Sequence, residues 1–410
     1  MNMTRVIFLT IFIIIAPVSI YAQLFYAPPS LAPYLEKDKP YIVSRAAVLI
    51  DANTGTILYS KNPNEDTPPA SLAKLMTMHI IMKAINEGRA SYDELVPITE
   101  ESWAQSQPRR SSLMFLEPGQ IVTLREILLG LAVSSGNDAA VAAALHFAPS
   151  MYEFANMMNA EAFKMGLLVT NFVEASGISR YNRTTAAEFA SFCRQYIQMH
   201  PHSLAEFHSV QQFSYPMAAN VRERHLESFT TITQTNGNSL LRTFIGTDGL
   251  KTGFINESGY NIAVTAERFD TRLILVLLGA PARPGGSRIR ADDSRLLLVW
   301  GFNNFKTVRP KIGKIENVRL WNGRRNRVEL VLSEPAEFTA HTSRADNLFY
   351  EVVIPDHLTA PVPAGLPAGY LGISDEMGEL IRIPLVTARA YERGNFLKRL
   401  WHSILMFFMY

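Results

Sequence analysis

Three short motifs in this chain together supply the groups needed for nucleophilic catalysis by a serine. They are Ser71-Leu-Ala-Lys74, Ser135-Gly-Asn137 and Lys251-Thr-Gly253. The first offers a hydroxyl nucleophile and an amine base, the second a proton relay and an amide, and the third a cation on a strand. Each motif is common by itself, but their order and wide spacing are hard to obtain by accident. The chemistry that they indicate is acyl transfer through an ester on the first serine.

Ser71 and Lys74 are expected to lie one turn apart at the start of a helix. The segment Thr67-Pro-Pro-Ala70 leads into this helix, whose first N–H groups and positive end would favour an oxyanion. The amine, three residues on, can reach the hydroxyl on the same helix face. To act as a base it must be neutral, which requires a pKa roughly 3 units below about 10.4, or roughly 4 kcal/mol. We expect burial and a second nearby cation to lower this pKa.

Ser135-Gly-Asn137 is expected in a turn between two helices. There Ser135 could relay a proton from Lys74 to a leaving amine, and Asn137 could bind a substrate amide. Ser60-Lys-Asn62 fits the same pattern, but it precedes the nucleophile and lies on a predicted strand. Without the other motifs, Ser-Gly-Asn would be read as a plain interhelical turn.

The third motif is expected on an edge strand beside the nucleophile, where an extended peptide could add by main-chain hydrogen bonds. Lys251 would attract a terminal carboxylate and lower the pKa of neighbouring groups, and Thr252 would offer that carboxylate a hydroxyl. Gly253 would allow close approach of the backbone. The N–H of Phe254 would then join that of Ser71 in an oxyanion hole.

Composition narrows the class of protein. The 410 residues suffice for two domains with separate cores, and the formal net charge of +2 argues against nucleic acid as a partner. Cys193, the only cysteine, excludes an internal disulfide and a cysteine metal cluster, and its apolar helical context indicates a buried core residue. No metal site and no cofactor are expected.

Hydrophobic periodicity predicts strands on both sides of a helical middle segment. The predicted strands cover residues 46–51, 56–60, 248–252, 259–266 and 272–279. The predicted helices cover residues 71–86, 123–133, 138–147, 150–165, 185–199 and 290–302. This order suits an α+β domain in which helices cover one antiparallel sheet. After the last helix, short alternating segments separated by Pro, Gly and Asn clusters predict a small all-β domain.

The N-terminus indicates export. Arg5 precedes an apolar run over residues 6–15 and a possible cleavage site after Ala22, which is typical of a secretory signal over residues 1–22. An uncleaved N-terminal anchor is the alternative. Residues 23–39, rich in proline and tyrosine, are expected to form an extended leader.

The C-terminal segment, residues 389–410, predicts an amphipathic helix that lies in a membrane interface. It is too short to span a bilayer, which needs about 20 apolar residues. A helix packed on the protein's own surface is the alternative. The apolar residues at helical spacing are Leu397, Leu400, Trp401, Ile404, Leu405 and Phe408, with Lys398, Arg399 and His402 opposite them.

Longer segments around the motifs resemble the serine-type D-Ala-D-Ala carboxypeptidases, the low-molecular-mass penicillin-binding proteins. These segments are Pro69–Thr77, Ser134–Ala142, Asn171–Gly177, Asn236–Leu241 and Asp248–Phe254. The resemblance covers a catalytic domain at about residues 40–305. A β-rich domain over 306–388 and the anchoring helix over 389–410 repeat the architecture of that family.

The resemblance implies removal of the terminal D-alanine from peptidoglycan pentapeptide stems, and acylation by penicillins and other β-lactams as inhibitors. It places the protein on the outer, periplasmic face of the cytoplasmic membrane, held by its C-terminal helix. By analogy Ser71 is acylated, Lys74 is the base, Ser135 relays the proton, and Lys251, Thr252 and Arg290 hold the substrate carboxylate. A solvated arginine at a helix start is the alternative for Arg290.

Two positions depart from the family, and three other functions remain open. Gly237 stands where a basic residue is common, and Ser176 where some relatives have histidine.

A D,D-endopeptidase of the same family is one alternative function, and a catalytically silent peptidoglycan-binding protein is another. A class A β-lactamase would need a glutamate that activates the deacylating water; Glu153, Glu161 and Glu174 lie in the right interval but outside the E-x-x-L-N context.

Overall fold

The computed structural model describes residues 28–221 and 229–409, and the side chains of the last two of these are not described. The expected signal segment, residues 1–22, lies outside the described residues. The described part of the expected leader is not wholly extended, because it contains a short helix, α1 (Ala32–Leu35).

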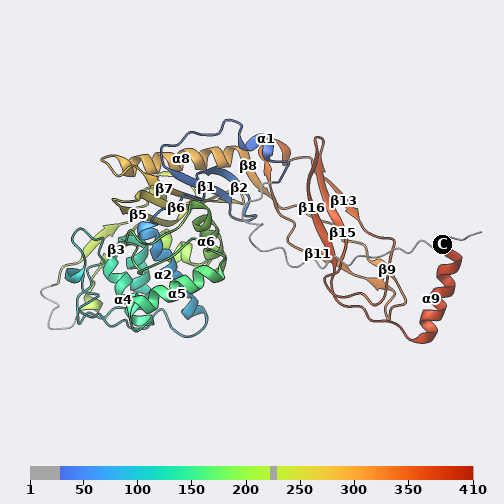
Figure 1. Ribbon diagram of the computed structural model, residues 1–410, viewed down its shortest axis with the longest axis horizontal. Coiled ribbons are helices and arrows are strands. Elements are labelled where there is room, and N and C mark those ends of the chain that lie inside the picture. The colour runs from blue at the N-terminus through green and yellow to red at the C-terminus, as the bar shows by residue number, and fades with distance from the viewer. Residues whose placement is uncertain (1–27, 222–228, 410) are drawn as a thin grey trace, which may run out of the picture.

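A five-stranded antiparallel sheet forms the centre of the larger part of the molecule (Figure 1). Its spatial order is β2-β1-β7-β6-β5, so β5 and β2 are the two edges. The strands are β1 (Ala46–Asp51), β2 (Ile57–Lys61), β5 (Thr247–Ile255), β6 (Gly259–Arg268) and β7 (Thr271–Ala280). The predicted strands were therefore right to within a few residues at each end.

Helices cover both faces of this sheet, as the alternating side chains of β7 require. Ile274 and Val276 pack into the core beneath the helical middle segment, whereas Leu273 and Leu275 pack against the helix that follows the sheet. Figure 1 shows α8 on one side and the other long helices on the opposite side. The helices are α2 (Lys74–Asn86), α3 (Leu124–Leu129), α4 (Asn137–Phe147), α5 (Met151–Lys164), α6 (Ala186–Met199), α7 (Leu240–Thr243) and α8 (Gly286–Asn304).

Polar residues begin three of these helices in the expected way. The side chain of Thr123 accepts a hydrogen bond from the N–H of Glu126, whose carboxylate accepts one from the N–H of Thr123 in return. Ser150 and Thr185 cap α5 and α6 in the same position. Cys193 is buried in α6, as predicted, and burial raises the pKa of its thiol.

Short helical turns and a two-stranded ribbon complete this part of the chain. The turns are η2 (Ala70–Ala73), η3 (Ala104–Ser106), η4 (Gly130–Ser134), η5 (Leu204–His208) and η6 (Ala218–Asn220), of which η4 and η5 are π-helical. The ribbon pairs β3 (Gln212–Tyr215) with β4 (Ile232–Thr235).

The C-terminal part is rich in short strands and lies beside the first part rather than around it (Figure 1). Its sheets have the orders β10-β9-β14, β11-β16-β15-β13 and β12-β8. The strands are β8 (Phe305–Val308), β9 (Val318–Trp321), β10 (Arg327–Val328), β11 (Leu330–Leu332), β12 (Phe338–His341), β13 (Phe349–Val353), β14 (His357–Thr359), β15 (Pro367–Asp375) and β16 (Gly378–Thr387), with one 3-10 turn, η8 (Thr342–Arg344).

A buried carboxylate joins the two parts. Asp51, at the end of β1, accepts hydrogen bonds of 2.8 Å from the hydroxyls of Thr307 and Thr339 on β8 and β12. Burial raises the pKa of Asp51, and these hydrogen bonds oppose that rise.

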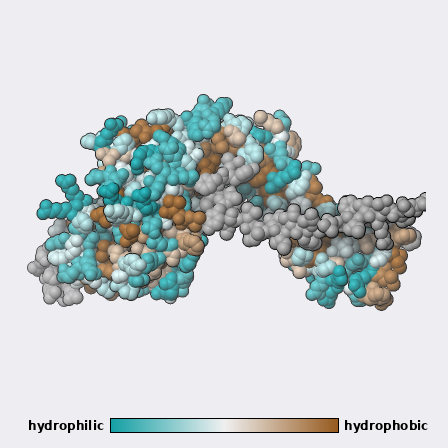
Figure 2. All heavy atoms as spheres, in the orientation of Figure 1, coloured by the Kyte–Doolittle hydropathy of each residue, from teal (hydrophilic) through white to brown (hydrophobic). Residues whose placement is uncertain are grey.

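The last helix, α9 (Phe396–Met409), leaves the β-rich part at its far end. Its His402 is buried, and Nδ1 accepts a hydrogen bond of 2.8 Å from the N–H of Asn322. The apolar side chains of Leu397, Leu400, Trp401 and Ile404 are exposed. Figure 2 shows apolar surface gathered at this end of the molecule. In the described part of the chain, no helix is long and apolar enough to cross a membrane.

Candidate active site

The serine nucleophile predicted from the sequence lies on a tight turn immediately before α2. Ser71 belongs to the 3-10 turn η2, whereas the α-helix proper begins at Lys74, so the predicted helix start was three residues too early. Ala70 has a φ of 53°, a left-handed conformation that few alanines adopt. Gly177 packs against it, since a Cβ on Gly177 would collide with the Ala70 carbonyl.

Lys74 reaches back to the serine from a fully buried position. Its Nζ lies 3.1 Å from Ser71 Oγ, 2.8 Å from Asn137 Oδ1 and 2.6 Å from the carbonyl oxygen of Ser176. The amide and the carbonyl oxygen accept hydrogen bonds and therefore leave the nitrogen lone pair of a neutral lysine for the serine hydroxyl. This is the geometry of a base poised to take the serine proton.

Burial lowers the pKa of Lys74 to about 7. The carboxylates of Glu174 and Asp138 oppose this effect and raise the pKa. The expected second cation is Lys251, whose own pKa is lowered mainly by burial and further by Lys74 and Arg290. Because repulsion between two cations is mutual, Lys251 also favours the neutral form of Lys74.

The second motif lies between η4 and α4, as predicted. Ser135 takes a left-handed conformation with a φ of 56°, and Asn137 begins α4. Among the described residues Lys74 makes a hydrogen bond to Asn137, and the Ser135 hydroxyl makes none.

Asp138 organises this turn, and the sequence reasoning missed its role. Its buried carboxylate accepts hydrogen bonds of 2.8–3.0 Å from the N–H groups of Met114, Phe115 and Leu116. The neighbouring Asn137 N–H donates to the carbonyl of Ser112. A carboxylate directly after Ser-Gly-Asn was the available signal, but its partners lie more than twenty residues away.

The third motif lies on β5, the edge strand beside η2, as predicted. Lys251 is buried, and its Nζ donates to the carbonyl of Thr252 over 3.1 Å. The hydroxyl of Thr252 faces Gly237, where an added Cβ would come within 2.9 Å of Oγ1. The glycine at position 237 thus leaves this hydroxyl uncrowded.

Gly253 permits the close approach of β5 to the nucleophile. A Cβ at this position would lie 2.9 Å from the backbone nitrogen of Ser71 and 3.1 Å from the Cβ of Ala70. The following residue, Phe254, is 41% exposed, and its ring centre lies 4.3 Å from that of Tyr260. An aromatic pair therefore directly follows the third motif on β5.

Arg290 is buried within α8 and does not lie at a helix start, because α8 begins at Gly286. Its guanidinium donates to the carbonyl of Gly237 over 3.2 Å and lies 5.9 Å from the Tyr260 ring centre. Its Nε has no hydrogen-bond partner among the residues that the structure describes, and burial lowers the pKa of Arg290 to about 10. The alternative of a solvated arginine was wrong; a buried cation lies close enough to Lys251 to lower the lysine's pKa.

The three glutamates that a β-lactamase reading would use have other partners or face solvent. Glu174 accepts hydrogen bonds of 2.6 Å from Ser176 Oγ and from Asn182 Nδ2, so both of its oxygens are engaged within its own loop. Glu161 pairs with Lys83 on the surface of α5. Glu153 is exposed in the first turn of that helix.

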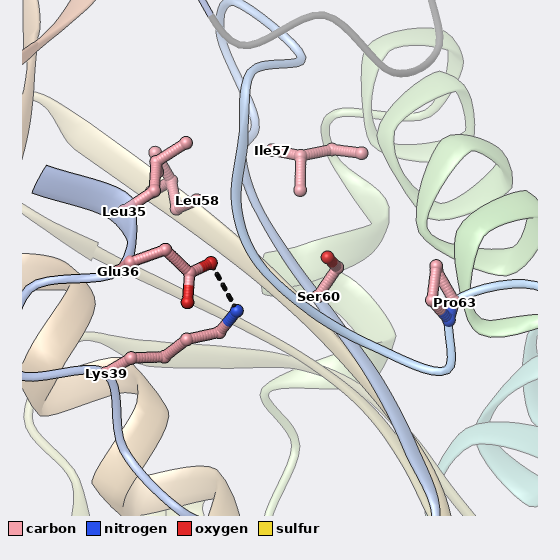
Figure 3. A pocket seen from close by; sticks show the side chains of 7 residues that line it. All are labelled: Leu35, Glu36, Lys39, Ile57, Leu58, Ser60 and Pro63. Atoms are coloured by element: carbon pink, nitrogen blue, oxygen red, sulfur yellow. Dashed lines mark hydrogen bonds and ion pairs between the residues drawn. The ribbon is translucent and has the colours of Figure 1, made fainter. Parts of the chain in front are cut away.

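A separate hollow lies at the opposite edge of the sheet, beside β2 (Figure 3). Its lining includes the ion pair of Glu36 and Lys39, whose atoms lie 2.7 Å apart. The lining residues are Leu35, Glu36, Lys39, Ile57, Leu58, Ser60 and Pro63. No residue of the three motifs lines this hollow. Ser60, which belongs to the rejected Ser60-Lys-Asn62 pattern, is part of the lining.

Two family models match the chain. The model described as D-alanyl-D-alanine carboxypeptidase matches residues 35–282, and that of the penicillin-binding protein 5 C-terminal domain matches residues 306–393. The chain is 31% identical over 390 residues to the D-alanyl-D-alanine carboxypeptidase DacC of Escherichia coli, with 93% of each chain covered.

Solved structures agree with these matches. Penicillin-binding protein 5 from Haemophilus influenzae has a TM-score of 0.76 at 29% identity, with 86% of this chain and 99% of that one covered. Penicillin-binding protein D2 from Listeria monocytogenes in its cefotaxime-bound form has a TM-score of 0.55 at 26% identity, with 64% and 99% covered.

Proposed function

Because the chain belongs to the D-alanyl-D-alanine carboxypeptidase family, we propose that it removes the terminal D-alanine of peptidoglycan stem peptides through an ester on Ser71. The observation that carries this proposal is the 3.1 Å separation of Lys74 Nζ from Ser71 Oγ. A pKa of about 7 leaves a large fraction of this lysine neutral at physiological pH. The first step is then removal of the serine proton by the lysine amine.

Formation of the ester follows from that step. Ser71 Oγ attacks the carbonyl carbon before the terminal residue, and the N–H groups of Ser71 and Phe254 stabilise the oxyanion. The C–N bond then breaks, and the leaving amine takes the proton from Lys74 through the hydroxyl of Ser135. Water afterwards attacks the ester, which releases the shortened stem as a carboxylic acid and restores the serine hydroxyl.

Recognition of the substrate rests on groups around the serine. Lys251, Arg290 and the hydroxyl of Thr252 bind the terminal carboxylate, and Asn137 binds a backbone amide of the stem. Buried cations are costly unless an anion joins them, so the carboxylate of the substrate relieves the repulsion between Lys251 and its neighbours. The β-lactam ring, also an amide next to a carboxylate, acylates the same serine.

We propose the cellular location from the sequence pattern of residues 1–22 and from the exposed apolar face of α9. Residues 1–22 direct export, and the protein then lies on the periplasmic face of the cytoplasmic membrane. The exposed apolar side chains of α9 enter the lipid interface, while His402 keeps the helix joined to the β-rich part. The proposed divisions of the chain are residues 40–305, 306–388 and 389–410, after a leader over 23–39.

The proposed reaction is tested by following release of D-alanine from a synthetic pentapeptide ending in D-Ala-D-Ala. The protein should release one D-alanine per peptide, and Ser71→Ala should release none. Cleavage only of cross-linked dimers of stems, with the pentapeptide left intact, would favour the endopeptidase instead. A protein that binds peptidoglycan without cleaving either substrate would be the silent binding protein.

A further inference from the structure

A buried histidine that the proposed mechanism does not use lies directly behind the third motif. His208 ends the π-helical turn η5 and is fully buried. Its Nδ1 lies 3.2 Å from the carbonyl oxygen of Leu250, the residue before Lys251, and its Nε2 lies 2.7 Å from the hydroxyl of Tyr196 on α6. It therefore connects the edge strand β5 to the helical core.

The two contacts fix which ring nitrogen carries the proton. A carbonyl oxygen can only accept, so Nδ1 of His208 is the donor to Leu250. In a neutral ring Nε2 is then an acceptor, and the hydroxyl of Tyr196 must donate to it. Burial, together with the smaller effects of Lys251 and His200, lowers the pKa of His208 to about 3, so the ring adds no charge to the site.

Lys251 depends on its strand for its position. Among the described residues no ion pair includes this lysine, and its amine donates one hydrogen bond, to the adjacent Thr252 carbonyl. The nearby cations Lys74 and Arg290 repel it. Side-chain partners thus do little to hold the lysine, and the backbone of β5 must do so.

That backbone is supported differently on its two sides. β6 pairs with β5 along its inner side, where Leu250 lies opposite Val264. On the outer side the carbonyl of Leu250 is held by His208, and the carbonyl of Gly249 accepts a hydrogen bond of 3.0 Å from Asn238 Nδ2. An edge strand without such partners is free to shift outward at this point.

We propose that His208 is a positioning residue for carboxylate recognition: its Nδ1–H holds the Leu250 carbonyl so that β5 presents Lys251 to the terminal carboxylate of the substrate. This inference rests on the proposed function, because it assumes that Lys251 binds that carboxylate. A histidine that merely fills the core would affect all reactions of Ser71 alike. A positioning residue affects reactions that need the carboxylate more than those that do not.

The test compares benzylpenicillin with its methyl ester, which lacks the free carboxylate. Acylation rates of the full-length protein are measured with each compound, and the quantity of interest is the ratio of acid to ester rates. His208→Leu, which removes the donor, should lower this ratio about tenfold and change the ester rate less than about twofold. It should also raise KM for the pentapeptide more than it lowers kcat.

Three further variants serve as controls. His208→Asn keeps a donor, Nδ2, at the place of Nδ1, so the ratio should stay within about twofold of the unmodified protein. Tyr196→Phe frees the ring to rotate, and the ratio should fall about threefold. His200→Asn changes a neighbouring buried histidine that contacts His79 and not β5, so its ratio should not change.

Equal losses with acid and ester in His208→Leu would overturn the inference, as would a His208→Asn ratio as low as that of His208→Leu. If His208→Leu does not fold, as judged by its thermal unfolding, an unchanged ratio in Tyr196→Phe would overturn it equally. An unmodified protein that reacts with neither compound would contradict the proposed function itself, which distinguishes the two failures.

Discussion

Lys74 Nζ lies 3.1 Å from Ser71 Oγ, and the lysine is fully buried. The two residues nevertheless belong to different helical elements, η2 and α2. The change from a 3-10 turn to an α-helix falls between them. Because the turn leaves the serine half-buried while the helix buries the lysine completely, the nucleophile can meet substrate and the base can remain desolvated. Burial thus lowers the pKa of the lysine base at the point where the chain changes from a 3-10 turn to an α-helix.

The pH dependence of the acylation rate should follow the deprotonation of Lys74. Since the pKa of Lys74 is lowered to about 7 and the neutral form is the base, acylation by benzylpenicillin should rise with pH and reach half its maximum near pH 7. Stopped-flow measurements between pH 5 and 9 would show this. Lys74→Arg, which stays charged throughout, should lose about 10²–10⁴-fold in rate and the rising limb with it.

Asp138 should be required for folding as well as for the site. In Asp138→Ala the buried N–H groups of Met114 and Leu116 and the partly buried one of Phe115 lose their acceptor. The free energy of unfolding should therefore fall by about 3 kcal/mol, at a cost of about 1–3 kcal/mol for each buried unpaired group. Urea unfolding provides the measurement. Asp138→Asn keeps one acceptor oxygen and should lose less; equal losses in the two variants would argue against this hydrogen-bond account.

Gly253, the glycine of the third motif, should be needed for the close approach of β5 to Ser71. Gly253→Ala places a Cβ 2.9 Å from the Ser71 nitrogen, so β5 and the serine turn must move apart and the acylation rate should fall by about 10²-fold or more, the scale seen when an oxyanion donor is lost. Gly313→Ala, where a Cβ meets nothing within 4 Å, is the matched control and should acylate normally. A normal rate in Gly253→Ala would contradict the proposed close approach.

The last helix should control membrane binding without affecting catalysis. Replacing the exposed Leu400 and Trp401 with serine removes apolar area that would enter the lipid, and binding to anionic vesicles should fall about tenfold or more. Co-sedimentation with vesicles measures this, with D-alanine release in solution as the activity control. Ser403→Ala, on the same helix, should bind vesicles as the unmodified protein does. Unchanged binding in the double variant would contradict the proposed membrane anchoring.

Much of the fold could be predicted because its signals are local. The short apolar runs of β1, β6 and β7 and the capping residues of α3, α5 and α6 are local features of the sequence, and these elements were predicted to within a few residues. The start of α8 was missed by four residues, because Gly285 and Gly286 read as loop. Because of that error, a solvated arginine at a helix start stayed open as the alternative for Arg290, which is buried in the second turn of the helix.

The features that could not be predicted depend on partners distant in sequence. Asp138 receives its hydrogen bonds from residues 114–116, and His208 meets Leu250 across more than forty residues. The low pKa of Lys74 and its main cause, burial, could be anticipated, but the opposing effect of Glu174 and Asp138 could not, because tertiary folding places these two carboxylates.

The central claim, an ester on Ser71, is tested most directly by intact mass spectrometry of the protein mixed with benzylpenicillin, followed over time beside Ser71→Ala. The account predicts a long-lived adduct of one penicillin on the unmodified protein and none on the variant. An adduct that persists in Ser71→Ala would contradict the assignment of the nucleophile. Rapid turnover of penicillin with no lasting adduct would indicate a β-lactamase and contradict the proposed function.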